Sequence, residues 1–480
     1  MRDYLVAATL VVAMGAMLLG VPAATRPFPA VQRHARSITH FLSAVLTSIG
    51  VYAVESRWLI LAVGALAIPS LVAAIELGLL GSMLTGSRIR DYGFVAYGIG
   101  FVLAVALFMP DRRAIAAALL TLGVADPLAS IVGGRFGRHR VATWRSVRTV
   151  EGGLAFAVAA FLVGFVAFAA SGSLDRTTVS AAVFIAATSA AVEMLLPSAL
   201  DNLGIPLWAG LLYFLVGRHA HAPGVDWFVA VAVSAPGAMV VARLRWLDGA
   251  AAIAAFVSAA TSLALGGWDW LLPILAFLVT GSVLTKLHAT DAERRPRSLE
   301  QTAVNGIVPL LPVIGYALTK DSAWYVLYVG AVAVANADTW ATEIGRLFGG
   351  APVSLRTFRR TEKGASGAVT LVGTAASLAG GGLVGAIAAA VNSTSSDLVL
   401  VAVGAVIGPL GMALDSALGA WAQCRYRCSS CDAWHERPLH CGTASPVVAG
   451  LRGLTNERVN LVSNFAGALL ALELSVVVGR

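Results

Sequence analysis

The chain alternates between long apolar stretches and short polar ones from end to end. Each apolar stretch has about the length needed to cross ~30 Å of hydrocarbon as a helix. Because backbone polar groups find no water inside a bilayer, segments that span it must bond these groups internally. The pattern therefore predicts an all-α, polytopic membrane protein with roughly sixteen transmembrane helices. We expect them near residues 4–22, 38–56, 58–80, 92–109, 112–132, 151–171, 177–198, 204–217, 226–242, 248–265, 268–285, 303–319, 323–345, 366–391, 396–422 and 459–479.

The composition excludes an ordinary soluble domain. Charged residues make up 12% of the chain, whereas globular proteins carry about 25%. The first apolar segment lies near the N-terminus, as a signal peptide does. It is longer than most signal-peptide cores, and Pro22-Ala23-Ala24 is a weak cleavage site, so we expect a retained helix. The only extended polar stretch is 424–458, and we expect no soluble domain.

Basic residues are distributed unevenly between alternate loops. With the N-terminus outside, the inner loops hold 26 of the 34 Lys and Arg residues and the outer segments hold 8. Cytoplasmic loops accumulate positive charge, so this distribution predicts an inner-membrane protein with cytoplasmic basic loops. The net charge of +8 then belongs to loops that face anionic lipid or a phosphorylated ligand, and it does not indicate nucleic acid.

A polar motif occurs twice, 212 residues apart. Asp126 and Asp338 are each followed by glycines and an arginine in the same order, and the register pairs 148–152 with 360–364 without a gap. An even number of predicted helices separates the copies, so the repeats should be parallel, with both loops on the inner side. The repetition predicts two polar sites of common design.

Each copy contains a second aspartate, in the echoed sequence Ala-Leu-Asp at 199–201 and 413–415. An unpaired charge at the end of an apolar helix costs several kcal/mol, so capping, salt bridges to a basic loop, or function must account for these residues. Carboxylates from separate helices can share one Mg²⁺. The residues expected to be catalytic and to bind Mg²⁺ are Asp126, Asp201, Asp338 and Asp415.

Glycines and arginines after the first aspartate suggest a phosphate site, although a turn between helices is the alternative. Backbone amides freed by glycine, beside arginine, suit a di- or triphosphate. Thr149 and Thr361 are expected to cap the next helix, whose N-terminus can hold a phosphate. Glu151 is matched by Lys363, a two-charge difference that suits a neutral alcohol in the first site and a monophosphate in the second. Phosphate or nucleotide contacts are expected from Gly133, Gly134, Arg135, Gly137, Arg148, Thr149, Glu151, Asn202, Gly345, Arg360, Thr361 and Lys363.

All four cysteines lie in one polar stretch. Cys428-x-x-Cys431 followed by His440-Cys441 fits a tetrahedral zinc site, with unrelated thiols as the alternative. Disulfides do not persist on the reducing side of the membrane, where the charge distribution places this loop. The sequence therefore predicts a structural Zn²⁺, with Cys424 left in the preceding helix.

The first half, over about residues 90–215, resembles the phytol kinase family, relatives of dolichol kinase and the membrane cytidylyltransferases. The matching segments are 125–137, 148–156, 192–193, 201–202 and Pro206. Arg36-x-x-x-His40 is similar to an Arg-Lys-x-x-His element of these families, without its lysine.

The second half, over about residues 270–475, resembles the phytyl-phosphate kinase family, known also from transmembrane protein 19. The matching segments are 301–306, 337–345, 364–367, 414–420, 440–442 and 456–460. The further site residues that this resemblance implies are Asn305, Glu343, Ser366, Asn456 and Asn460.

Together the resemblances imply a bifunctional isoprenoid kinase, with a first domain at 1–220, linking helices at 221–265 and a second domain at 266–480. The first would phosphorylate a prenyl alcohol of the phytol or geranylgeraniol class, and the second would convert the monophosphate to the diphosphate. The donor would be CTP or ATP with Mg²⁺. The alternatives are a transporter or lipid flippase, since carriers share internal repeats, and a membrane cytidylyltransferase in the first half. The alcohol, the base and the oligomeric state stay open.

Overall fold

A computed structural model describes the chain except for residues 33, 81–91, 144–145, 220–223, 289–295, 393–395, 433, 437–438 and 479–480. The side chains of Ala30, His219, His288, Trp434 and His440 also lie outside the described part. Within the described ranges, eleven helices are long and apolar enough to cross a membrane. The chain is an all-α polytopic membrane protein, as predicted, and each predicted span coincides with a long helix.

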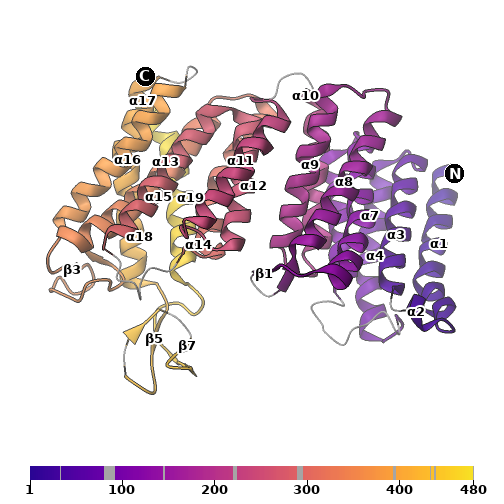
Figure 1. Cartoon of the computed structure of the whole chain (residues 1–480), viewed down its shortest axis with the longest axis horizontal. Helices are drawn as coiled ribbons and strands as arrows, with labels where there is room; N and C mark the ends of the chain where they lie inside the picture. The colour runs from indigo at the N-terminus through magenta and orange to yellow at the C-terminus, as the bar shows by residue number, and fades with distance from the viewer. Residues whose placement is uncertain are drawn as a thin grey trace. The chain divides into compact units, whose positions relative to one another are not determined.

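The chain divides into two compact units, Met1–Ala238 and Met239–Arg480. The boundary falls inside α11, within the region that the sequence assigned to linking helices. The elements of unit 1 are α1 (Arg2–Thr25), α2 (Pro29–Gln32), α3 (Ala35–Ala53), α4 (Arg57–Glu76), α6 (Gly93–Phe108), α7 (Arg112–Phe136), β1 (Arg140–Thr143), β2 (Ser146–Thr149), α8 (Val150–Ala170), α9 (Arg176–Leu195), α10 (Asp201–His219) and α11 (Trp227–Arg243) (Figure 1).

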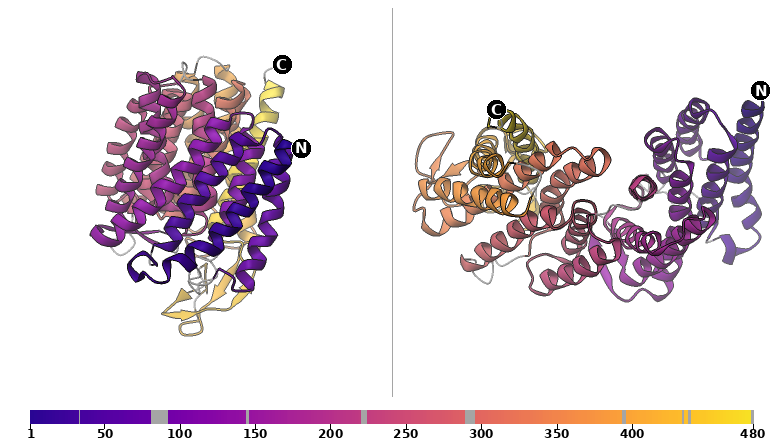
Figure 2. Two further views of the ribbon diagram at one scale, coloured as in Figure 1. Left: turned by 90° about the vertical axis from the view of Figure 1, so that its right-hand side faces the viewer. Right: turned by 90° about the horizontal axis from the view of Figure 1, so that it is seen from above.

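Unit 2 has a similar content of helices, with additional short strands. Its helices run roughly alongside one another (Figure 2). Its elements are α12 (Gly249–Gly266), α13 (Trp268–His288), α14 (Leu299–Thr319), α15 (Ala323–Phe348), β3 (Val353–Ser354), β4 (Ala368–Val369), α16 (Leu371–Val391), α17 (Asp397–Ala402), the π-helical turn η2 (Val403–Ile407), α18 (Gly408–Trp421), β5 (Arg425–Arg427), β6 (Trp434–His435), β7 (Leu439–His440), β8 (Thr443–Ala444), β9 (Val447–Ala449) and α19 (Asn456–Val478).

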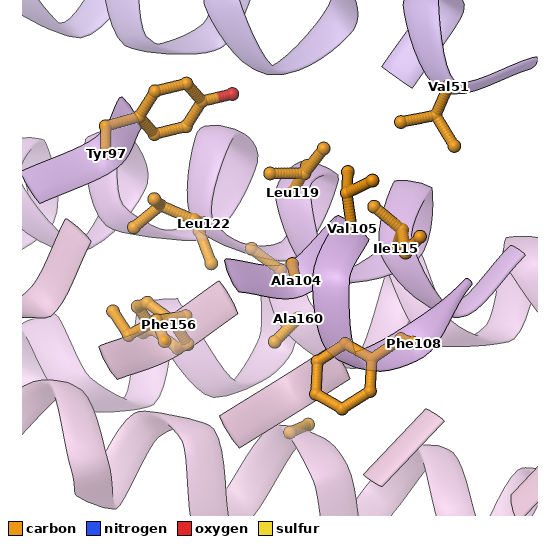
Figure 3. Close-up of a cluster of buried hydrophobic side chains, with 14 of the residues drawn as sticks. Val51, Tyr97, Ala104, Val105, Phe108, Ile115, Leu119, Leu122, Phe156 and Ala160 are labelled. Atoms are coloured by element: carbon orange, nitrogen blue, oxygen red, sulfur yellow. The ribbon is translucent and has the colours of Figure 1, made fainter. Parts of the chain in front are cut away.

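The core of unit 1 forms around α7, which packs against α3, α8 and α10. Phe108 of α6, Leu119 and Leu122 of α7, and Phe156 of α8 are buried together, with alanines between them (Figure 3). Small residues let helix backbones approach closely where lipid provides no hydrophobic driving force between helices. This packing fixes the C-terminal half of α7, which carries Asp126 ten residues before the last residue of the helix, so the prediction that Asp126 lies at a helix end was wrong.

The repeated motif folds into the same closely packed helix pair in both units, α7 with α8 and α15 with α16. A Cβ added to Gly133 would lie 2.6 Å from Oγ1 of Thr149, and one added to Gly345 would lie 2.9 Å from Oγ1 of Thr370. Both distances are too short for a real carbon, so glycine is required at each crossing. The repeat is therefore a repeat of helix packing.

The structure corrects the predicted register beyond that crossing. Thr370, not Thr361, occupies the position of Thr149, because Oγ1 of each capping threonine accepts from the amide three residues later. Thr361 lies in the segment between β3 and β4, where its amide donates to the Pro352 carbonyl. The matching residues of α8 and α16 are thus 221 positions apart rather than 212. The pairing of Thr361 with Thr149 and of Lys363 with Glu151 was wrong, because the connecting segment of unit 2 is nine residues longer.

Candidate functional site

A polar cavity of about 230 Å³ opens within unit 1 beside the C-terminal half of α7. Its walls come from α3, α7, β2, the α9–α10 turn and the start of α10. It brings together four of the predicted residues, Asp126, Arg148, Asp201 and Asn202. The remaining lining residues are Arg36, Ser37, His40, Ser130 and Ser198.

Arg148 organises one wall of this cavity. Strand β2 carries the side chain between two carboxylates: Nη1 lies 2.9 Å from Oε1 of Glu193, and Nη2 donates to Oδ2 of Asp201 at 2.7 Å. Burial lowers the pKa of Arg148, but Glu193 and Asp201 raise it, and the net result lies above the usual range. The guanidinium is therefore a fixed positive charge held in place by charge-assisted hydrogen bonds to two carboxylates.

The same cavity is lined by a histidine and an aspartate in contact. Nδ1 of His40 lies 3.6 Å from Oδ2 of Asp126, and their side chains are 7% and 22% exposed. Nε2 of His40 is buried and has no hydrogen-bond partner among the described residues. One imidazole nitrogen thus faces a carboxylate and the other has an unused capacity for a hydrogen bond, an arrangement suited to proton transfer.

Asn202 has a positioning role beside this centre. Its side-chain amide donates to the carbonyl of Gly93 at 2.9 Å and ties the start of α10 to α6. Its backbone amide donates to Oδ1 of Asp201 at 2.8 Å. The first bond holds the start of α10 in place, and the second orients the Asp201 carboxylate, which Arg148 also contacts.

The predicted glycine loop of unit 1 is not a loop. Gly133, Gly134 and Arg135 belong to the last turns of α7, and Gly137 is the residue that ends the helix. Their backbone amides are engaged in helical hydrogen bonds, because α7 continues to Phe136. The Arg135 guanidinium lies over the Phe136 ring. The expectation that these glycine amides cradle phosphate was therefore wrong.

Glu151 also lies apart from the cavity. Its carboxylate Oε1 contacts Nδ1 of His139 at 2.7 Å, and the His139 amide points to both carboxylate oxygens. The residues that line the cavity do not include Glu151. This carboxylate joins the β1 strand region to the start of α8.

In unit 2, Asp338 and Asp415 interact electrostatically across the interface of α15 and α18. Ser463 of α19 lies near Asp415, with its hydroxyl donating to the Val459 carbonyl at 3.0 Å, and Arg346 attracts the Asp338 carboxylate. Glu343, five residues beyond Asp338 on α15, accepts from Thr285 at 2.8 Å and is attracted to the buried Arg297. The two predicted aspartates are thus brought together, with Glu343 nearby.

Asp415 occupies the place of Glu193 rather than that of Asp201. It lies in the second helical segment after the repeated motif, as Glu193 does, whereas Asp201 begins the third. Glu193 follows Gly152 by 41 residues, and Asp415 follows Gly373 by 42. The π-helical turn η2 accounts for the additional residue, because such turns insert one residue into a helix. The Ala-Leu-Asp echo was therefore a wrong pairing.

The other predicted residues of unit 2 are distributed over three places. Asn305 of α14 accepts from the Asn464 side chain at 2.9 Å. Lys363 donates to the Arg346 carbonyl at 2.9 Å, and the Ser366 hydroxyl bonds Glu436. The remaining residues lie in the β3–β4 segment, at the end of α15 and in the first turns of α19: Arg360, Thr361, Gly345, Asn456 and Asn460.

Unit 2 also has an apolar groove with a polar end, between α12, α13 and α14. Arg297, Gln301 and Asn305 lie at the polar end, and the Arg297 guanidinium is 5.4 Å from the centre of the Phe277 ring. Burial lowers the pKa of Arg297, which the Glu343 carboxylate partly offsets. The apolar lining consists mainly of Leu247, Leu271, Ile274, Leu275, Phe277 and Leu278.

Several residues of the two sites were missed or given no role. Arg36 and His40 lie four residues apart and so face the same side of α3. This spacing could have predicted that both side chains belong to one site. Glu193 is an acid within an apolar segment, which is a signal of function in membranes. Ser463 and Asn464 interrupt the last apolar segment in the same way. The contacts themselves join segments far apart in the chain, which no local pattern reveals.

Three of the four predicted zinc ligands come together. The sulfur atoms of Cys428, Cys431 and Cys441 all lie within 4.8 Å of one another. Cys424 is buried, forms no disulfide and is separate from this group. It follows the end of α18 at Trp421, so the prediction that it lies in the preceding helix was wrong. The side chain of His440 lies outside the described residues.

The sequence is similar to several integral membrane proteins. Residues 232–468 match the family model "Integral membrane protein DUF92". Protein PGR of Arabidopsis thaliana is 30% identical over 237 residues, which cover 43% of this chain and 81% of that protein. The chain belongs to the DUF92 family.

Two further relatives of this DUF92 protein extend the comparison. An uncharacterized membrane protein of Methanocaldococcus jannaschii is 27% identical over 250 residues, covering 51% of this chain and 92% of the relative. A phytol kinase of Synechocystis is 28% identical over 179 residues, covering 37% of this chain and 76% of that enzyme. No solved structure matches significantly. The similarity to phytol kinase agrees with part of the resemblance seen in the sequence and does not assign separate activities to the two halves.

Proposed function

We propose that the chain is a membrane kinase that phosphorylates an isoprenoid alcohol in unit 1 and the resulting monophosphate in unit 2. The observation that carries the proposal is the unit 1 cavity, where Asp126, Asp201, Arg148 and His40 converge in a relative of a phytol kinase. Phosphoryl transfer consists largely of positioning and charge neutralisation, which these residues can supply.

In the first step, Nε2 of His40 accepts the proton of the alcohol as the hydroxyl oxygen attacks the terminal phosphorus of the donor. The new O–P bond forms while the bond to the nucleoside diphosphate breaks, and Asp126 stabilises the imidazolium through Nδ1. Arg148 neutralises charge on the transferring group. Asp126 and Asp201 line the same cavity and offer oxygen ligands for Mg²⁺. When bound, Mg²⁺ would neutralise the donor phosphates.

In the second step, the attacking atom is a phosphate oxygen. Because the second pKa of a phosphate monoester is about 6, this oxygen is ionised at neutral pH and requires no base. Asp338 and Asp415 form the carboxylate pair that would hold Mg²⁺ in unit 2, and Arg346 supplies positive charge beside Asp338. The apolar groove would contact part of the isoprenoid chain, with Arg297 at the groove's polar end near the phosphate.

The proposal is tested with the full-length protein in nanodiscs, Mg²⁺, geranylgeraniol or phytol, and CTP or ATP labelled at the terminal phosphate. We expect labelled mono- and diphosphate from the wild type. Asp126→Asn should lower alcohol phosphorylation by about 10²-fold or more, since it removes a preorganised charged group. The same variant should still convert added prenyl monophosphate to diphosphate. Asp338→Asn should accumulate the monophosphate.

Glu151→Gln provides a matched control, because this carboxylate lies in the same unit and contacts His139 away from the cavity. It should leave both steps within about twofold of the wild type. Failure of every tested prenol and donor to give either product would contradict the proposal and leave transport as the alternative. Release of pyrophosphate with a cytidylylated lipid would identify a cytidylyltransferase instead.

A further inference from the structure

The connection between α18 and α19 contains a cluster of thiols that the proposed kinase chemistry does not use. Strands β5, β6 and β9 form one small sheet, and β7 and β8 form a hairpin. The strands extend beyond the ends of the helices of unit 2 (Figures 1 and 2). Cys428 and Cys431 lie in the turn after β5, and Cys441 lies in the turn between β7 and β8. Two separate turns therefore present thiols to one point.

The geometry at this point is that of a metal site. The three sulfur atoms lie within 4.8 Å of one another, and those of Cys431 and Cys441 are 3.6 Å apart. The Ser430 amide donates to Sγ of Cys428 at 3.4 Å, as an outer partner that orients a ligand does. A single disulfide would use two of the three thiols, whereas a tetrahedral Zn²⁺ uses all three and one more ligand. Soft thiolate ligands select Zn²⁺ over Mg²⁺.

We propose that Cys428, Cys431 and Cys441 bind one structural Zn²⁺, with His440 as the fourth ligand. His440 directly precedes Cys441 in the sequence, and it is the fourth member of the pattern Cys428-x-x-Cys431 followed by His440-Cys441. His435, the other histidine of this stretch, stacks on Tyr426 with ring centres 6.1 Å apart. Four protein ligands close the coordination sphere, which makes the ion a structural element rather than a catalyst.

The zinc site would fix the position of this sheet against the β3–β4 segment and the end of α18. Glu436, between the two thiol-bearing turns, bonds the Ser366 hydroxyl. Nη2 of Arg425 donates to the carbonyls of Ser366 and Gly419 at 3.2 and 3.0 Å. Ser366 belongs to the β3–β4 segment, and Gly419 lies one turn beyond Asp415 on α18. The metal therefore orders the β3–β4 segment, which contains Ser366, near the pair Asp338 and Asp415.

The test measures zinc, which makes it independent of kinase activity. Full-length protein purified from zinc-supplemented cells should contain about one Zn per chain by elemental analysis. Cys428→Ser, Cys431→Ser, Cys441→Ser and His440→Asn should each lose most of this zinc. Cys424→Ser and His435→Asn are the matched controls and should retain it. Replacement by Co²⁺ should give thiolate charge-transfer bands and tetrahedral d–d bands in the wild type.

A second measurement covers variants that fold poorly. Chelation of zinc from the wild type should expose the sheet to protease cleavage within 424–458, and added Zn²⁺ should restore protection. Zinc-free wild-type protein, or retention of zinc in the three cysteine variants, would overturn the site. Retention in His440→Asn with loss in His435→Asn would overturn the assignment of the fourth ligand.

Discussion

At the scale of single residues, the repeated glycines have a packing role that the sequence did not reveal. Gly133 lies where α7 crosses the start of α8, and a Cβ there would lie 2.6 Å from Oγ1 of Thr149 and 3.4 Å from Cα of Gly152. Its neighbour Gly134 faces open space, with no atom within 4 Å of an added Cβ. Adjacent glycines of one helical turn therefore differ in what they tolerate.

This difference gives a prediction for two neighbouring substitutions. Gly133→Ala should destabilise the protein by about 1–3 kcal/mol, because the helices must separate to admit a methyl group. Gly134→Ala should be neutral or stabilising by up to about 1 kcal/mol, because alanine favours the helix. Thermal unfolding in detergent measures both. An equal loss in the two variants would argue against close packing as the reason for the glycine.

At the scale of elements, the threonine caps define the true correspondence between the units. Thr149 begins α8 and Thr370 begins α16, and each accepts from the amide of a glycine, at 3.2 and 2.9 Å. Thr361, like Thr149, directly follows an arginine, but it lies nine residues before the capping residue Thr370. The similarity of the local sequence at Thr361 is therefore not a similarity of structure.

We expect Thr149→Ala and Thr370→Ala each to lower stability by about 1 kcal/mol, since each removes a helix cap. Thr361→Ala should change stability by no more than about 0.5 kcal/mol, the usual range away from such features. Serine at 149 or 370 should retain most of the stability. Chemical or thermal unfolding of these five variants tests the register, and a larger effect of alanine at 361 than at 370 would support the ungapped alignment instead.

The sequence predicted the helices well because an apolar segment of bilayer length has few alternative structures. It also singled out Asp126, Arg148 and Asp201, which line one cavity, because charges are costly in an apolar chain unless they are paired or used. The roles of Gly133 and Glu151 could not be predicted, since they depend on which side chain faces which helix. His40 and Glu193 contact partners that lie 86 and 45 residues away in the chain, and local patterns carry no information on such contacts.

At the scale of the whole molecule, one chain carries two compact units, each with a group of buried polar residues. If the units act in succession, the product of the first is a lipid monophosphate that must reach the second. Each buried CH₂ contributes ~0.8 kcal/mol to membrane binding, so a long-chain monophosphate stays in the bilayer where it forms. Transfer in the plane of the membrane would then be efficient without release into water.

Mixing two defective proteins tests this division of labour. Asp126→Asn and Asp338→Asn reconstituted in the same vesicles should together form diphosphate from the alcohol, more slowly than the wild type and after a lag. In separate vesicles the diphosphate should form far more slowly, because the monophosphate must cross water. If each variant catalyses its remaining step but the mixture forms no diphosphate, the two units do not act as independent catalysts that exchange the monophosphate through the membrane.

The π-helical turn η2 has a consequence for the direction in which the second carboxylate points. Each residue of an α-helix advances the azimuth by about 100°, and η2 adds one residue before Asp415 while Gly404 within it packs against Gly381 of α16. A chain without that residue would keep the length and hydropathy of the span but would turn Asp415 toward another neighbour. The helical phase, rather than the identity of the acid, thus decides which face of the span carries the charge.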